Sequence, residues 1–211
     1  MVIKYGEPWL MWPDKVSYGI NKVDIMETFN GSFTISLNVK ILSEGFEKKT
    51  IFARLPNYIG LDVEGEQNRV LLILNHTKGT EYIMSDMGIH DGYNLLSMRY
   101  DKPSKVMDII LGDSIILTHQ LGEEELDNGH EPHILFGSGN FPHNGFNLNY
   151  CEYDIDYLMI SNQCLNIEKI KQIKSDTTLE ESVIGMYNFQ RHTDYKVYDL
   201  TGNCNFLHKV I

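Results

Sequence analysis

Apolar and polar residues alternate along much of the chain, most regularly between residues 33 and 41. In Phe33–Ile41 every odd position is apolar and every even position is polar. Such strict alternation predicts a β-strand with one buried face. Shorter strand candidates follow at regular intervals, separated by turn clusters: Thr50–Leu55, Asn57–Val63, Arg69–Leu74, Tyr93–Tyr100, Lys105–Leu111, Ser114–Thr118 and His133–Phe136. This succession predicts an all-β chain folded as an antiparallel sandwich or barrel.

One segment departs from the period of two and follows a helical period instead. Ile167, Ile170 and Ile173 recur every three residues, and Asn166 stands directly before them. Asparagine is a good N-cap, and Leu165 before it is placed to pack on Ile170 as a hydrophobic staple. The pattern therefore predicts one short helix near residues 166–174.

Composition and charge narrow the possible partners. The chain has 211 residues, 42% of them hydrophobic and 22% charged, which suits a single globular domain. Its formal net charge of −11 disfavours binding to nucleic acid and to anionic membrane surfaces. No apolar run approaches the roughly 18 residues of a transmembrane span, and Met1–Lys15 lacks a signal-peptide core. We expect neither membrane insertion nor a removable leader, and no particular compartment is predicted.

Two motifs in the second half of the chain resemble a known fold family. The first is Tyr153–Asn162, which leads through Cys164 and Leu165 into the predicted helix. It resembles the late strand and short helix of laminin G-like, concanavalin A-like jelly rolls. In those domains an isoleucine-aspartate pair opens the strand and a leucine-serine-like cap opens the helix. Here Ile155-Asp156 and Leu165-Asn166 stand at these positions.

The second motif lies near the C-terminus, in Val183–Phe189 and Tyr195–Phe206. Its stretch Asp199-Leu200-Thr201-Gly202-Asn203 resembles an element that the family usually places at the start of the domain. Either the chain is circularly permuted, which we favour, or its tail completes a sheet in a neighbouring copy. The resemblance implies one jelly-roll domain over residues 31–211. Residues 1–30 would then be an N-terminal arm that packs on the sandwich or on a partner through Trp9 and Trp12.

A carboxylate cluster is the candidate catalytic feature. Glu152, Asp154 and Asp156 alternate along the predicted strand, so they are expected on one face. The pattern is similar to that of concanavalin A-like retaining glucanases, which implies Glu152 as nucleophile, Asp154 as modulator and Asp156 as acid. The last glutamate of that pattern is replaced by an aspartate. The laminin G-like register instead makes Asp156 a buried structural residue that accepts backbone hydrogen bonds beside inward Leu158 and Ile160.

Two further groups of residues are candidates for binding a metal ion or a ligand. Oxygen ligands for Ca²⁺ are available at Asp127, Asn128, Asp199 and Asn203. The alternative for the last two is a tight turn, in which Asp199 accepts local hydrogen bonds and Gly202 adopts a positive φ. A loop rich in aromatic, amide and imidazole groups is the candidate ligand-binding segment: Phe141, His143, Asn144, Phe146, Asn147 and Tyr150.

The resemblance and the incomplete carboxylate pattern favour a non-catalytic recognition or adhesion module. Its expected partner is a carbohydrate or cell-surface glycan, as for a lectin. A second interpretation is a structural or decoration module of a viral particle such as a phage. That module would sit on the virion surface and contact other virion proteins or copies of itself. A third is a glucanase-like glycoside hydrolase.

Overall fold

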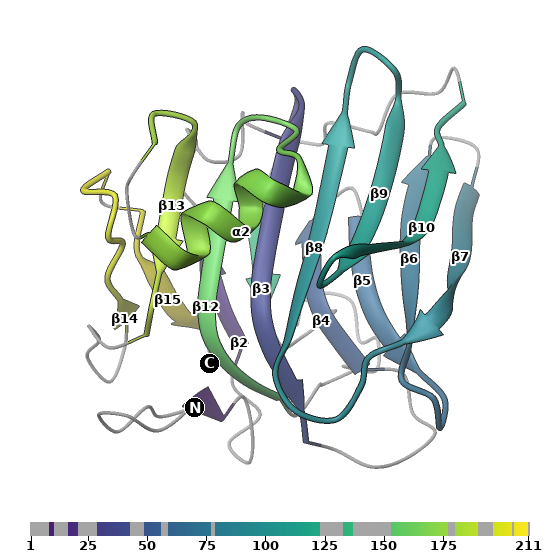
Figure 1. The fold of residues 1–211 in the computed structure, drawn as a ribbon, viewed down its shortest axis with the longest axis horizontal. Helices are drawn as coiled ribbons and strands as arrows, with labels where there is room; N and C mark the ends of the chain where they lie inside the picture. The colour runs from purple at the N-terminus through teal and green to yellow at the C-terminus, as the bar shows by residue number, and fades with distance from the viewer. Residues whose placement is uncertain are drawn as a thin grey trace.

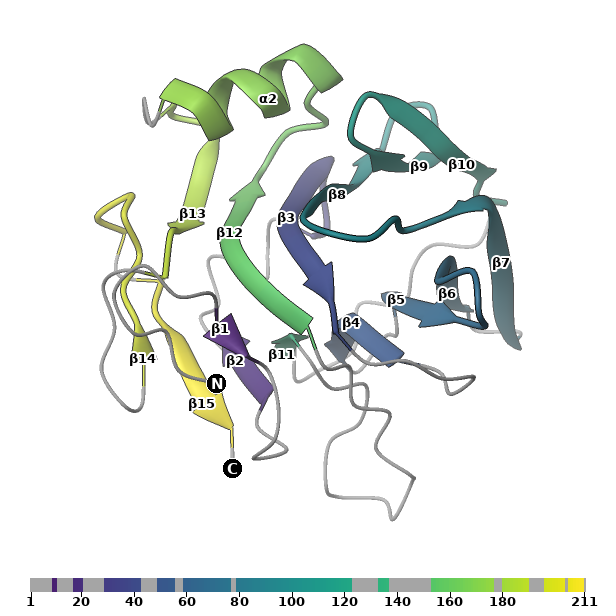
Figure 2. The ribbon, with the colours of Figure 1, turned by 60° about the horizontal axis from the view of Figure 1, so that its bottom comes forward.

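A computed structural model shows two antiparallel β-sheets packed face to face, with helix α2 (Ile167–Asp176) on the outside of one of them (Figures 1 and 2). The structure describes residues 9–10, 17–20, 29–42, 49–55, 59–76, 79–122, 133–136, 153–176, 180–189, 196–203 and 205–210. Every strand pairing within these residues is antiparallel, which confirms the predicted all-β sandwich.

The sheet that carries the helix, sheet A, has seven strands in the order β1-β12-β3-β8-β9-β10, with β13 also paired to β12. Its strands are β1 (Trp9–Leu10), β3 (Phe33–Ile41), β8 (Asn94–Asp101), β9 (Val106–Leu111), β10 (Ser114–Gln120), β12 (Tyr153–Ser161) and β13 (Val183–Tyr187). The alternation of β3 places Phe33, Ile35, Leu37 and Val39 in the core, each at most 1% exposed.

The opposite sheet, sheet B, has eight strands in the order β14-β15-β2-β11-β4-β5-β6-β7. Its strands are β2 (Ser17–Ile20), β4 (Lys49–Leu55), β5 (Ile59–Glu64), β6 (Arg69–His76), β7 (Gly79–Gly88), β11 (His133–Phe136), β14 (Lys196–Val197) and β15 (Leu207–Val210). At one side of the sandwich, β7 and β10 approach each other, and His119 Nε2 lies 3.1 Å from Glu81 Oε2.

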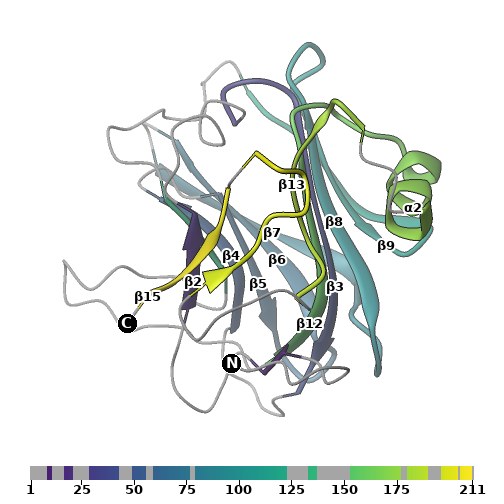
Figure 3. The same cartoon turned by 90° about the vertical axis from the view of Figure 1, so that its left-hand side faces the viewer.

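The predicted helix is present as α2, Ile167–Asp176, against the outer face of sheet A (Figure 3). Asn166 caps it by accepting a hydrogen bond from the Lys169 N–H at 2.8 Å. Ile170 and Ile173 are each 2% exposed and pack with Leu165 on the sheet, which stabilises the docked helix by about 2 kcal/mol for each isoleucine. No helix within the described ranges is long and apolar enough to span a membrane.

Both ends of the chain contribute strands to the sandwich. Residues 1–30 were expected to form an arm that packs on the sandwich or on a partner; within them β1 pairs with β12 in sheet A, and β2 lies between β15 and β11 in sheet B. Trp12 lies outside the described residues. The C-terminal strand β15 pairs with β2 of the same chain, so the tail completes its own sheet.

Candidate functional site

A β-bulge on β12 changes the expected arrangement of the acidic residues. Ile155 pairs with Val39 and Tyr157 with Asn38, so Asp156 is the extra residue on β12. Beyond it Leu158 and Ile160 point into the core, as predicted, and both are fully buried. Asp156 itself is exposed, and its Oδ1 accepts a hydrogen bond from Asn38 Nδ2 at 2.7 Å. The prediction of a buried Asp156 bonded to backbone donors is therefore wrong.

Asp156, Asn38 and Tyr93 form what we term the polar end of the candidate site, on the outer face of sheet A. Tyr93 precedes β8 and is 42% exposed. Partial burial of its phenol, and then the charges of Asp154 and Asp156, raise its pKa from 10.0 to about 12. The phenol thus lies within electrostatic reach of both carboxylates. Asp154 is 7% exposed, so Asp156 is the carboxylate that faces solvent here.

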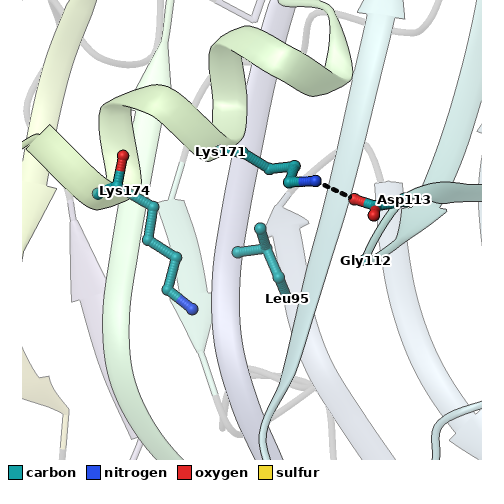
Figure 4. A pocket seen from close by; sticks show the side chains of 6 residues that line it. Leu95, Gly112, Asp113, Lys171 and Lys174 are labelled. Atoms are coloured by element: carbon teal, nitrogen blue, oxygen red, sulfur yellow. Dashed lines mark hydrogen bonds and ion pairs between the residues drawn. The ribbon is translucent and has the colours of Figure 1, made fainter.

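Next to the polar end lies a cavity of about 450 Å³ between α2 and the edge of sheet A, which we term the lysine cavity. Its lining residues are Leu95, Gly112, Asp113, Lys171, Lys174 and Ser175. In Figure 4 the two lysine side chains extend from α2 on either side of Leu95, with Lys174 on the side of β12. Lys171 Nζ lies 2.6 Å from Asp113 Oδ1. The volume falls within the roughly 300–1,000 Å³ typical of small-ligand sites.

The pairing of the strands places the polar end and the cavity side by side. Asn38 pairs directly with Leu95 across β3 and β8, and Tyr157 pairs with Asn38 on its other side. Gly112, in the turn between β9 and β10, donates its N–H to the Leu95 carbonyl at 2.8 Å. This turn therefore lies next to Leu95. Directly paired residues have neighbouring side chains on one face, so the two parts form one continuous surface.

Under α2 the same sheet face holds polar groups that bond to one another. Arg99 donates to Asp108 Oδ2 from Nε at 3.0 Å and from Nη2 at 2.8 Å, and to the Leu165 carbonyl at 3.0 Å. Thr118 donates to Asp108 Oδ1 at 2.7 Å. Thr34 Oγ1 bridges the segment that enters α2 by donating to the Gln163 carbonyl at 2.7 Å and accepting from the Leu165 N–H at 2.9 Å. These contacts anchor the helix.

The predicted turn at Asp199 is also present. Asp199 Oδ1 accepts from the N–H groups of Met186 and Thr201, and Oδ2 accepts from the Thr201 hydroxyl and the Asn205 N–H, at 2.7 to 3.1 Å. Gly202 has a φ of +81°, as expected for this turn. Four donors thus bond to the two oxygens of one carboxylate, as the turn alternative requires. Asn203 donates from Nδ2 to the Ile184 carbonyl at 3.3 Å.

The remaining predicted site residues lie outside the described ranges. They are Glu152, Asp127, Asn128, and the loop residues Phe141, His143, Asn144, Phe146, Asn147 and Tyr150. Calcium binding and the aromatic ligand loop therefore stay predictions. Within the described parts of the chain, no three His, Cys, Asp or Glu side chains are grouped so as to hold a metal ion.

The sequence analysis did not identify Tyr93, Asn38 and the two lysines as site residues. Asn38 stood out only as one of the polar positions of an alternating strand, and Lys171 and Lys174 as charges on a short helix. One feature of the sequence could have indicated a shared site: the spacing of Lys171, Lys174 and Ser175 places all three on one side of a helix. What that side faces depends on how the helix docks on the sheet.

No protein-family model and no curated protein matches the chain. Solved structures do share its fold. A protein of Bacteroides ovatus, named as a candidate carbohydrate-binding protein, aligns over 92% of this chain with a TM-score of 0.69 and 13% identity; this chain spans only 55% of its length.

Two further similar structures come from different organisms. The carbohydrate-binding module CBM40 of a Ruminococcus gnavus sialidase, bound to α2,3-sialyllactose, has a TM-score of 0.60 at 13% identity. That alignment covers 74% of this chain and 91% of the module. A pentraxin of Limulus polyphemus has a TM-score of 0.51 at 11% identity over 76% of this chain and 75% of its own. The chain has the jelly-roll β-sandwich fold, of the concanavalin A-like type, that these proteins share.

Proposed function

We propose that this chain is a non-catalytic carbohydrate-recognition module that binds a saccharide on the outer face of sheet A, across the polar end and the lysine cavity. The observation that carries the proposal is the exposed Asp156, held by Asn38 next to a cavity large enough for a small ligand, with the exposed Tyr93 two residues before the cavity residue Leu95. The similar CBM40 module adds support, because a domain of the same fold is bound to a sugar, α2,3-sialyllactose.

The chemistry of the surface suits a sugar. A pyranose presents apolar C–H patches between hydroxyl groups, so it favours an aromatic face flanked by fixed hydrogen-bonding groups. Tyr93 offers such a face, and the hydrogen bond from Asn38 to Asp156 holds both polar side chains in place. Groups fixed in this way lose little conformational entropy when the ligand binds. Leu95 supplies apolar surface beside them.

The positions of the aspartates support a non-catalytic role. Hydrolysis by paired carboxyl groups requires both of them to reach the scissile bond. Asp154 is 7% exposed, whereas Asp156 is exposed and bonded to Asn38. Among the described residues of this acidic segment Asp156 is the one exposed carboxylate, and a single accessible carboxylate suits binding rather than bond cleavage. We expect the protein to release no reducing ends from any glycan that it binds. A role in a virion stays a prediction.

A glycan array, followed by titration calorimetry with the best ligand, tests the proposal. We expect Tyr93→Ala to weaken binding by at least about fivefold, because aromatic stacking contributes on the order of 1 kcal/mol or more. Asp156→Asn should weaken it less, since the amide still bonds to hydroxyl groups. The matched control is Tyr82→Ala, which removes a tyrosine that is 61% exposed on the opposite sheet.

Two results would contradict the proposal. One is an array without any bound glycan, obtained with protein whose circular dichroism shows folded β-structure. The other is a ligand whose affinity falls equally in Tyr93→Ala and Tyr82→Ala, because this would place binding elsewhere. Release of reducing ends would instead restore the glucanase interpretation.

A further inference from the structure

The lysine cavity carries an excess of positive charge. Lys171 is paired with Asp113 across the cavity mouth, and both side chains are more than half exposed. Lys174 lines the cavity but has no ion-pair partner among the described residues. Two cations and one anion leave one uncompensated positive charge. This local excess lies in a molecule with a formal net charge of −11.

A structural reason for Lys174 would be the helix itself. Lysines in the last turn of a helix interact favourably with the negative end of its dipole. In Figure 4, however, the Lys174 side chain extends away from α2, with Leu95 between it and Lys171, and it lines the cavity. Its ammonium group is therefore presented to the cavity, where a ligand next to Leu95 would meet it.

We infer that the saccharide carries a negatively charged group, a carboxylate or a sulfate, and that Lys174 binds this group inside the lysine cavity. The inference rests on the proposed function of the same surface. Lys171 stays paired with Asp113, so Lys174 supplies the ion pair. The exposed carboxylate of Asp156 disfavours a negative group of the ligand next to it. In this orientation the neutral hydroxyl groups of the saccharide lie at the polar end, and its negatively charged group lies beside α2.

Matched pairs of sugars that differ only in charge test this directly. Suitable pairs are methyl β-glucuronide with methyl β-glucoside, 3′-sialyllactose with lactose, and sulfated with unsulfated lactose. Binding is followed through the backbone amide NMR signals of Gly112, Asp113 and Ser175. We expect at least one acidic sugar to bind about tenfold more tightly than its neutral partner, as a charge-assisted hydrogen bond allows. The preference should shrink as the salt concentration rises.

Two lysine variants distinguish the effect of the Lys174 contact from the effect of the net charge of the protein. Lys174→Met should abolish the preference, so that the acidic sugar and its neutral partner bind with equal affinity. Lys169→Met is the control, because it removes a positive charge from the same helix at a residue that pairs with Glu180 and does not line the cavity. It should retain the preference.

The outcomes distinguish this inference from the proposed function. Equal affinity for acidic and neutral sugars in every pair, with binding still dependent on Tyr93, overturns the inference and leaves the function standing. A preference that survives Lys174→Met also overturns it. Absence of any Tyr93-dependent sugar binding overturns both. If the sulfated sugar alone is preferred, inorganic sulfate should compete with it.

Discussion

Helix α2 divides the outer face of sheet A into a covered part and an open part, and the two differ in how their polar groups are satisfied. Under the helix, Asp108 accepts hydrogen bonds on both of its oxygens from Arg99 and Thr118. Beside the helix, exposed Asp156 accepts one from Asn38, and Lys174 faces a cavity. The same strands, β3 and β8, contribute residues to both parts.

The difference shows how one polar strand face can serve two purposes. Thr34 and Ser36 on β3 are fully buried, and each bonds to a nearby polar group of the chain. A buried polar group that is already paired stabilises the fold and has little capacity for a ligand. Farther along the same strand, Asn38 lies at the edge of the open part. Here the side chains are positioned but keep access to solvent, which is the condition for binding.

The largest effect is expected in the covered part, from Arg99→Met. This change leaves the Asp108 carboxylate, 11% exposed, without its cation and frees the Leu165 carbonyl. We expect the free energy of unfolding to fall by about 3 kcal/mol, and the melting temperature by about 6 to 12 °C. Urea and thermal denaturation measure both quantities.

The control for Arg99→Met is a cation of the open part, Lys171→Met. Its ion pair with Asp113 is exposed on both sides, so the loss should stay below about 1 kcal/mol. If the two variants unfold at the same urea concentration, the covered network does not stabilise the protein more than the surface pair does. The comparison between the two parts would then fail.

A smaller loss is expected from Asp199→Asn, next to the covered part. Leu200, which follows Asp199, packs against the cluster under α2. The new amide group would face the Thr201 hydroxyl and the Asn205 N–H, two donors that need an acceptor. We expect a loss of about 2 kcal/mol that is the same in calcium chloride and in EDTA. A loss that appears only with calcium would instead show that Asp199 binds the ion.

Local sequence patterns predicted most of the fold. The nine-residue strand β3 and helix α2 were identified because alternation and a three-residue repeat are local signals. Strand β7 was missed, since it is an edge strand whose residues are largely exposed and lack a regular apolar period. Strand β2 was missed because it falls within residues 1–30, which were interpreted as an arm. An edge position removes the signal that burial would otherwise impose on a sequence.

The candidate site was less predictable, because it depends on contacts between distant segments. Asn38, Tyr93 and Lys174 belong to β3, the turn before β8, and α2. Nothing near any one of them in the sequence indicates the other two. The sequence did point to Asp154 and Asp156, but their expected alternation was interrupted by the bulge. A bulge depends on pairing with the partner strand, which a single strand's sequence does not reveal.

The smallest effect concerns the ionisation of Tyr93 at the polar end. Burial, and then the charges of Asp154 and Asp156, raise the pKa of its phenol from 10.0 to about 12. A raised folded-state pKa means that folding favours the neutral phenol. Its contribution to stability is therefore complete below pH 10 and disappears as the pH rises from about 10 to 12.

Substituting the aspartates should lower the pKa of Tyr93 without restoring its ordinary value, because burial is the larger cause. Asp154→Asn is expected to lower the pKa of Tyr93 more than Asp156→Asn does, because the charge of Asp154 raises this pKa more. The ¹³Cζ NMR signal of Tyr93, assigned with Tyr93→Phe, reports this titration. Asp113→Asn removes a carboxylate on the far side of the cavity and should leave the pKa of Tyr93 unchanged. An ordinary pKa for Tyr93 in the unmodified protein would mean that the phenol does not lie beside these carboxylates. The open part would then lose the aromatic group on which sugar binding depends.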